Sequence, residues 1–173
     1  MRYVDAQKET ASVVLDTTVI VKSLLKPAKY LPRSIYDREL STHKKCRTIM
    51  RLLKKKSYLV YFPRAGLIEV AAVLRRNNIN QDMVRSILNA IEKTFIVVSE
   101  DLLFDEAVEV ALLEAPSGFD TYFIALALKV KALLLTDDEP MAVHARNLNV
   151  RTVLVRAMSE EEILKELNSN NKS

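Results

Sequence analysis

The sequence predicts an α/β fold in which helices cover both faces of a parallel sheet. Two observations support this fold class. Short apolar runs, mostly rich in Val, Ile, Leu, Tyr or Phe, alternate along the chain with longer segments of helical period. No internal repeat, low-complexity segment or domain boundary interrupts the 173 residues. Alternating strands and helices are typical of parallel sheets, and this length favours a single domain over 1–173.

Five apolar runs are too short for helices, and we expect them to form strands. They lie at 12–16, 58–62, 95–98, 132–136 and 152–155. The core of the domain therefore extends from about 12 to 155. Pro27 and Pro32 indicate that the segment 26–38 is a loop between the first two helices.

Eight further segments repeat apolar residues at helical spacing. We expect helices at 18–25, 35–55, 64–76, 81–93, 101–114, 119–131, 140–147 and 160–168. The segment 119–131 is apolar on nearly all sides, which indicates deep burial. Ser159, with Glu162 three residues later, forms a capping box at the start of the C-terminal helix, at about 159–168.

The composition excludes several classes of protein. A single cysteine, Cys46, rules out an internal disulfide framework, and two histidines cannot complete a cysteine–histidine zinc site. Because Gly66 and Gly118 are the only glycines, neither a glycine-rich phosphate loop nor a GxSxG elbow can form. We interpret His144 as a surface or packed histidine. No run approaches a membrane span and no signal peptide is visible, so we expect a cytoplasmic protein with no membrane partner.

The net charge of +4 is unevenly distributed, and it suggests a polyanionic partner. Seven basic residues and no acidic residue lie between 44 and 56. Such a cluster fits the backbone of RNA, although it could also form a solvated helix face. Arg75 and Arg76 could hold a phosphate. They could also merely close a helix, where their positive charge interacts favourably with the helix dipole. The candidate RNA-binding residues are Lys44, Lys45, Arg47, Arg51, Arg75 and Arg76.

Four acidic residues lie far apart in sequence, each at the end of a strand or on a helix. Asp16 ends the first expected strand, and Asp138 closes the run that begins with the fourth. Asp120 lies in the first turn of its helix, and Glu69 in the second turn of another. Ligands of open α/β sheets bind beyond the carboxyl ends of the strands, so we expect these carboxylates to gather there. Mg²⁺ and Mn²⁺ prefer such oxygen ligands, and two ions would suit phosphodiester hydrolysis.

Each acid also has a purely structural interpretation. Asp16 could be a turn residue, Asp120 a favourable charge at a helix N-terminus, and Asp137 or Asp138 a helix cap. Glu69 lies among apolar neighbours but could still turn outward. Four converging carboxylates would repel one another and raise at least one pKa. Such a cluster therefore persists only if a cation offsets its charge.

Four segments, taken in order, resemble the motifs of the PIN-domain family. They are Val14–Ile20, Ile68–Val70, Phe119–Ala127 and Leu135–Asp138. The resemblance implies a PIN-like, Rossmann-like three-layer α/β/α sandwich with a central parallel sheet of about four or five strands. It also implies Mg²⁺- or Mn²⁺-dependent cleavage of RNA. The small prokaryotic members are VapC-type toxins, which an antitoxin holds inactive and which are often homodimeric.

The resemblance also implies roles for individual residues. The catalytic and metal-binding quartet would be Asp16, Glu69, Asp120 and Asp138. Thr17 or Thr18 matches the small hydroxyl residue after the first acid, and Thr136 the one before the fourth. Asp137 is a rival to Asp138, although the T-x-D spacing favours Asp138.

We therefore predict a metal-dependent endoribonuclease, a hydrolase of RNA phosphodiester bonds, that acts as the toxin of a toxin–antitoxin pair. Its partners would be RNA, a small antitoxin protein and a second copy of the chain. One alternative is a PIN-like RNA-processing nuclease outside such a pair, since the segment 26–56 and the C-terminal helix look longer than in compact toxins. Another is a non-catalytic RNA- or protein-binding module. A haloacid-dehalogenase-type phosphatase would need DxDxT, but the chain has no second Asp after Asp16-Thr17.

Overall fold

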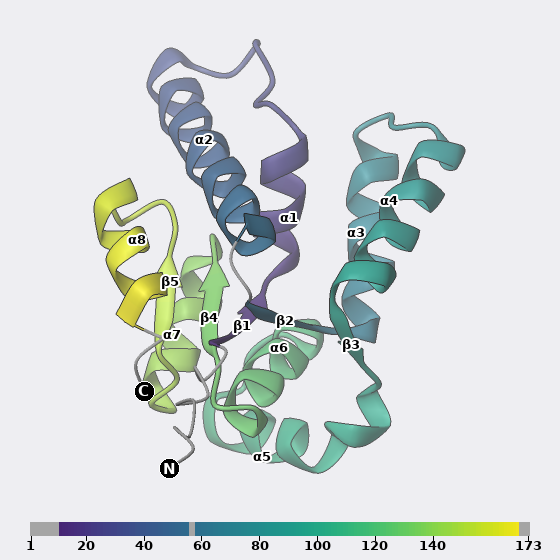
Figure 1. Ribbon diagram of the computed structural model, residues 1–173, viewed down its shortest axis with the longest axis vertical. Helices are drawn as coiled ribbons and strands as arrows, with labels where there is room; N and C mark the ends of the chain where they lie inside the picture. Colours follow the sequence, from purple (N-terminus) through teal and green to yellow (C-terminus); the bar gives the residue numbers. More distant parts are fainter. Residues whose placement is uncertain (1–10, 56–57, 170–173) are drawn as a thin grey trace, which may run out of the picture.

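The computed structural model describes residues 11–55 and 58–169. Within these residues, five strands form one parallel sheet in the order β3-β2-β1-β4-β5. The strands are β1 (Ser12–Leu15), β2 (Leu59–Pro63), β3 (Ile96–Val98), β4 (Leu133–Thr136) and β5 (Thr152–Leu154). Helices flank the sheet (Figure 1), and the predicted α/β/α sandwich is confirmed.

The helices of the described residues are α1 (Thr17–Leu24), α2 (Arg33–Lys55), α3 (Arg64–Arg76), α4 (Gln81–Thr94), α5 (Phe104–Glu114), α6 (Gly118–Lys129), α7 (Glu139–Asn147) and α8 (Glu160–Ser169), with a 3₁₀ turn η1 (Glu100–Leu102). Among them, α1–α2, α3–α4 and α5–α6 pack in pairs around this sheet. In Figure 1 the pairs α1–α2 and α3–α4 extend to one end of the molecule, whereas α5 and α6 lie toward the other. None of the helices in the described ranges is both long and apolar enough to cross a membrane.

Two expected elements differ from the structure. The loop predicted at 26–38 is wrong in its second half, because α2 begins at Arg33. The N–H of Tyr36 donates to the carbonyl of Pro32 at 2.9 Å, so the proline stands just before the helix, where its missing N–H costs nothing. The helix predicted at 101–114 is split into η1 and α5 at Leu103, whose N–H donates to the Glu100 carbonyl in a 3₁₀ bond.

The C-terminal helix is capped as predicted. The N–H of Ser159 donates to Glu162 Oε2 at 2.7 Å, and the N–H of Glu162 donates to Ser159 Oγ at 3.2 Å. This reciprocal pair is a capping box. It caps the start of α8, which lies beside β5 and near α2 in Figure 1.

Lys56, the last residue of the basic run at 44–56, lies outside the described residues.

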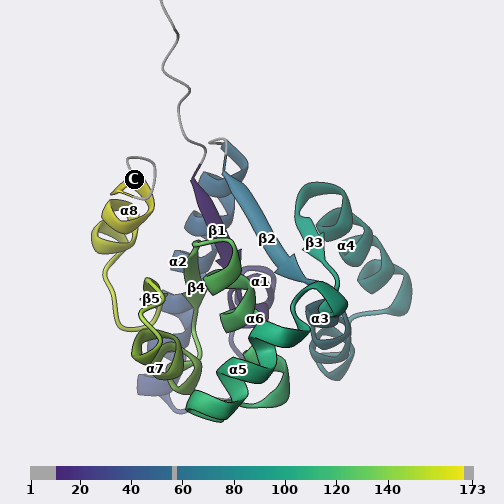
Figure 2. The same ribbon diagram turned by 90° about the horizontal axis from the view of Figure 1, so that it is seen from below.

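The centre of the sheet is buried and mostly apolar, and α6 covers it. β4 is buried along its whole length, and α6 contacts β1, β2 and β4. Figure 2 shows α6 on one side of β1 and α2 on the other. The core position of α6 explains why its sequence is apolar on nearly all sides: Phe123, Ile124 and Ala125 are completely buried.

The order of the strands determines where a ligand site can lie. From β1 the chain adds β2 and β3 on one side, and then returns to add β4 and β5 on the other. β1 therefore pairs with both β2 and β4, as in Val13 opposite Val60 and Leu133. Ligands of open α/β sheets bind at the carboxyl edge where the strand order reverses. In this chain that position lies between the ends of β1 and β4.

Candidate metal centre

Asp16 lies at this position, because it follows β1 directly and precedes the first residue of α1. It is buried, with 2% of its surface exposed. Two hydroxyls donate to the same carboxylate oxygen, Oδ2. One is Thr18 Oγ1, from the first turn of α1, and the other is Thr136 Oγ1, from the end of β4, at 2.7 Å. Two neighbouring elements therefore fix the orientation of this carboxylate.

Backbone amides orient these two hydroxyls in turn. The N–H of Asp137 donates to Thr18 Oγ1 at 3.0 Å, and the N–H of Asp138 donates to Thr136 Oγ1 at 2.9 Å. Because each hydroxyl accepts from an amide, its own hydrogen is directed to Asp16. Two parallel chains of hydrogen bonds therefore run from the turn after β4 to Asp16.

A cation bound near the Asp16 carboxyl would favour its ionised form. Burial raises its pKa to about 7. The hydrogen bonds from Thr18 and Thr136 lower this pKa, whereas the charges of Glu69 and Asp120 raise it. A like charge shifts a pKa in this way only from nearby, so α3 and α6 bring their carboxylates toward Asp16. A cation bound among them would stabilise the charged form of all three.

Asp120 lies in the first turn of α6, which Ser117 caps by accepting from the Asp120 N–H at 3.5 Å. Burial raises the pKa of the half-buried Asp120 carboxyl. The charge of Asp138 raises the pKa further, while a hydrogen bond from Ser117 and the charge of His144 lower it. Asp138 therefore belongs to the same electrostatic neighbourhood as Asp120.

The four predicted acids interact through their charges in three pairs, not all with one another. Glu69 and Asp120 act on Asp16, and Asp138 acts on Asp120. Glu69 is partly exposed in the second turn of α3. Asp138 also caps α7, because its Oδ1 accepts from the N–H of Met141 at 2.8 Å. The helix-cap interpretation of Asp138 therefore holds together with its place near the other acids, and one of its oxygens is used by the cap.

These carboxylates do not form a closed metal cage. Within 11–55 and 58–169, no three acidic, histidine or cysteine side chains lie close enough together to hold a metal ion. The donor set nevertheless fits Mg²⁺ or Mn²⁺, since these hard ions take carboxylate oxygens and usually keep several waters. A buried carboxylate with two like charges nearby also gives the uncompensated negative charge that a dication neutralises.

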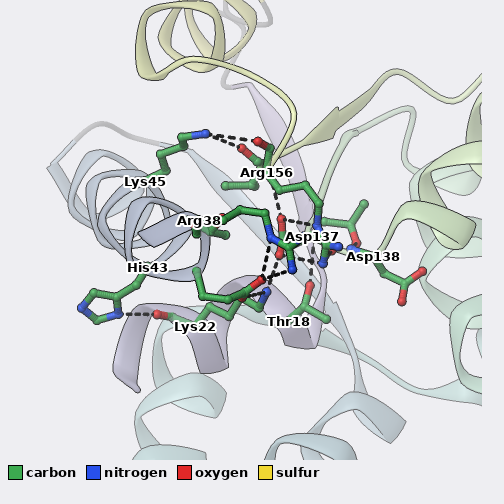
Figure 3. Close-up of polar contacts among 12 residues, drawn as sticks. Thr18, Lys22, Arg38, His43, Lys45, Asp137, Asp138 and Arg156 are labelled. Carbon is green, nitrogen blue, oxygen red and sulfur yellow. Dashed lines mark hydrogen bonds and ion pairs between the residues drawn. The ribbon is translucent and has the colours of Figure 1, made fainter. Parts of the chain in front are cut away.

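Asp137, the rival of Asp138, is engaged elsewhere. It is 1% exposed, and its carboxylate accepts from Lys22 Nζ at 2.5 Å and from Arg156 at 2.8 Å (main-chain N), 3.1 Å (Nη2) and 3.3 Å (Nε). Lys22 also contacts Glu39 of α2 at 2.5 Å. In Figure 3, Lys22 and Arg156 converge on Asp137, while Asp138 points to the other side. Two cations already neutralise Asp137, so the geometry favours Asp138 as a ligand.

Thr17 and Thr18, which the sequence could not separate, have different environments. Thr18 Oγ1 donates to Asp16. Thr17 is buried, and its Oγ1 finds no hydrogen-bond partner among the described residues. Thr18 is therefore the residue whose hydroxyl fits the supporting role.

Lys45, one of the predicted RNA-binding residues, has a structural contact. Its Nζ donates to the carbonyls of Val155 at 3.1 Å, Arg156 at 3.4 Å and Met158 at 2.7 Å. This ammonium group therefore ties α2 to the segment after β5, and the same segment carries the arginine that contacts Asp137.

The other basic candidates are exposed. Lys44, Arg47 and Arg51 follow one face of α2 at intervals of three and four residues. Arg75 and Arg76 lie at the end of α3, where Arg75 donates to a main-chain carbonyl just beyond the helix at 2.7 Å. This hydrogen bond supports the interpretation that Arg75 closes α3. The exposed residues of α2, in contrast, are accessible to a polyanion.

Sequence reasoning missed Lys22 and Arg156 near the acids, and it interpreted His144 only as a surface or packed histidine. Lys22 and Arg156 neutralise Asp137, and a signal existed for Arg156, because a basic residue just after a strand lies at the same sheet edge as the acids. His144 lies within electrostatic reach of Asp120, and its Nδ1 is 3.1 Å from Glu114 Oε2. No spacing in the sequence connects Glu114 to His144, which are 30 residues apart.

Comparison with known proteins places this geometry in context. The family model described as "PIN domain" matches residues 14–157. The chain is also similar to solved structures, among them three at 16% identity or below, a level that shows the fold alone. No curated protein matches the chain.

The solved structures cover most of the chain. PAE2754 from Pyrobaculum aerophilum is 13% identical with a TM-score of 0.57, over 92% of this chain and 90% of that one. VapC20 from Mycobacterium tuberculosis, described as a sarcin-ricin loop cleaving toxin, is 16% identical with a TM-score of 0.56, over 76% and 93%. FitAB, in a structure bound to the IR36 DNA fragment, is 16% identical with a TM-score of 0.57, over 85% of this chain and 97% of that one.

Proposed function

Because this chain belongs to the PIN-domain family, a family of nucleases, we propose that it is a Mg²⁺- or Mn²⁺-dependent endoribonuclease. The observation that carries the proposal is the state of Asp16. Its carboxylate is buried, takes two hydroxyl hydrogen bonds on one oxygen, and has a pKa raised to about 7 with the charges of Glu69 and Asp120 nearby. A purely structural aspartate gains nothing from such like-charged neighbours.

The acids would divide the work of holding the ion. Asp16 would bind it through the carboxylate oxygen that the two threonines leave, with Glu69 reaching from α3 and Asp120 from α6. Asp138 would contribute the oxygen that the α7 cap leaves. When bound, the ion supplies a water of lowered pKa and neutralises charge on the phosphate.

The exposed basic face of α2 supports RNA as the substrate. Lys44, Arg47 and Arg51 present three positive charges on one side of the helix. Contacts of this kind attract the phosphate backbone without reading its sequence, so binding would weaken steeply as salt is raised. Lys45 and Arg75 would contribute less, since each already donates to main-chain carbonyls.

For the biological role, we propose the toxin of a toxin–antitoxin pair. The fold-level likeness to VapC20, a toxin that cleaves the sarcin-ricin loop, supports it. The partners would then be an antitoxin protein and a second copy of this chain, in a cytoplasmic protein made of one domain over 1–173. A short gene for a small protein next to the gene for this chain would support the role. Light scattering of the purified chain gives its oligomeric state.

Cleavage of RNA tests the proposed activity. We expect the chain to cut single-stranded or looped RNA with Mg²⁺ or Mn²⁺ and to lose this activity in EDTA. The variant Asp16→Asn should lose cleavage while remaining folded. The matched control is Asp82→Asn, which removes an exposed acid from the first turn of α4 and should cleave normally. Cleavage that survives both EDTA and Asp16→Asn would reject the proposal.

A further inference from the structure

The buried ion cluster around Asp137 lies next to the proposed metal site but uses none of its four acids. It joins three separate parts of the chain. Lys22 comes from α1, Asp137 from the turn after β4, and Arg156 from the segment after β5. Arg156 Nη2 also donates to the main-chain carbonyl of Asp137 at 2.5 Å. Side chain and main chain of the same residue are therefore both held.

Holding Asp137 in this way fixes two main-chain amides. The N–H of Asp137 and the N–H of Asp138 donate to the hydroxyls of Thr18 and Thr136. These hydroxyls then donate to Oδ2 of Asp16. The orientation of the proposed ligand thus depends on a turn whose own position depends on the ion cluster.

From this connection, and on the basis of the metal site proposed above, we propose that Asp137 is a positioning residue for the bound divalent ion. It does not touch the ion. Through its own N–H it aligns the hydroxyl of Thr18, which orients Asp16, and Lys22 and Arg156 hold it in place. Groups that orient the ligands of a metal commonly change its affinity about 10- to 100-fold when they are removed.

A purely structural ion cluster would look similar in the folded protein but would behave differently in a thermodynamic cycle. If Asp137 acts through the hydroxyl of Thr18, its removal matters little once that hydroxyl is gone. If it only stabilises the fold, the two substitutions affect ion binding independently. A double-mutant cycle separates these cases.

The experiment measures the Kd of Mn²⁺ by titration calorimetry for the wild-type chain, Asp137→Asn, Thr18→Val and the double variant. We expect Asp137→Asn to weaken Mn²⁺ binding about tenfold, and to weaken it less than threefold in the Thr18→Val background. Lys129→Met, which breaks the ion pair with Glu106 at the opposite end of α6 from Asp120, is the matched control and should leave the Kd unchanged. Urea unfolding confirms that each variant is folded.

Each outcome is decisive. An unchanged Kd for Asp137→Asn, or an equal loss in both backgrounds, would overturn the positioning role while leaving the nuclease proposal intact. A wild-type chain that does not bind Mn²⁺ would instead reject the metal site itself. If Asp137→Asn does not fold, Lys22→Met replaces it in the same cycle, since Arg156 still holds the carboxylate. Lys22→Met must then show the same dependence on Thr18.

Discussion

The hydroxyl of Thr136 donates a 2.7 Å hydrogen bond to Oδ2 of Asp16, a residue 120 positions earlier in the chain. This bond joins the carboxyl ends of β1 and β4, which are paired in the sheet. It therefore belongs both to the fold and to the proposed metal site, and it can be tested in each capacity.

Thr136→Val should destabilise the protein. The substitution keeps the shape of the fully buried side chain, but it removes the donor to Asp16 and the acceptor for the N–H of Asp138. Leaving buried polar groups unpaired costs about 1–3 kcal/mol. Urea denaturation in EDTA measures the change. As a control, Thr94→Val removes a hydroxyl that bonds only within α4, and it should change stability by less than about 0.5 kcal/mol.

Asp16→Asn should become more stable than the wild type as the pH rises. The Asp16 pKa is about 7 in the folded chain and 3.8 as its ordinary value. The folded wild type therefore binds the extra proton between these values, so its stability falls as pH rises through this window. Asparagine lacks this penalty. In EDTA, the advantage of the variant should grow by roughly 2–3 kcal/mol from pH 5 to pH 8. An advantage of equal size at both pH values would contradict the raised pKa.

Binding of Mn²⁺ should strengthen with pH up to about 7. The ion must displace the proton of Asp16, whose pKa is about 7, so affinity should fall about tenfold for each pH unit below that value and level off above it. Calorimetry at pH 6 in buffers of different ionisation enthalpy should show release of about one proton per site. A Kd that is the same at pH 6 and pH 8 would exclude Asp16 as a ligand that must ionise.

Gly66→Ala should disturb the helix that carries Glu69. A Cβ at this position would lie 2.5 Å from Phe62 Cζ and 2.9 Å from Phe123 Cζ. The two rings pack edge to face in the core, so they have little room to move. Overpacking of this kind costs about 1–3 kcal/mol. We expect both lower stability and weaker Mn²⁺ binding, because α3 must shift.

The other glycine provides the comparison for this substitution. A Cβ at Gly118 would meet no atom within 4 Å, and the residue begins α6, two positions before Asp120. Gly118→Ala should be neutral or slightly stabilising, because alanine loses less backbone freedom in a helix. Equal destabilisation by both substitutions would show that the crowding at Gly66 is not the cause.

Much of the fold could be predicted because local sequence patterns indicate its elements. Each strand is a short apolar run, and the apolar residues on nearly every side of α6 indicate that it is buried. The start of α2 was harder, since Pro32 is a loop signal on its own and a helix-start signal only when the next residues continue as a helix. The break at Leu103 was also hidden, because its apolar neighbours fit one continuous helix.

The site was predictable only to the level of residue types. Acids at strand ends indicate a shared edge of the sheet, but adjacent residues such as Asp137 and Asp138 cannot be separated by spacing with certainty. Their difference comes from Lys22 and Arg156, which are far from them in sequence. Lys45 shows the same limitation, since a basic run gives no hint that one ammonium group holds main-chain carbonyls.

The position of β1 between β2 and β4 has a consequence for the synthesis of the protein on the ribosome. Asp16 leaves the ribosome early, yet β4, which flanks β1 on one side and is followed by Asp138, is made only after the three helical pairs α1–α2, α3–α4 and α5–α6. For most of its synthesis a nascent chain therefore lacks one of the four candidate acids. The proposed site can be complete only after Asp138 has been made.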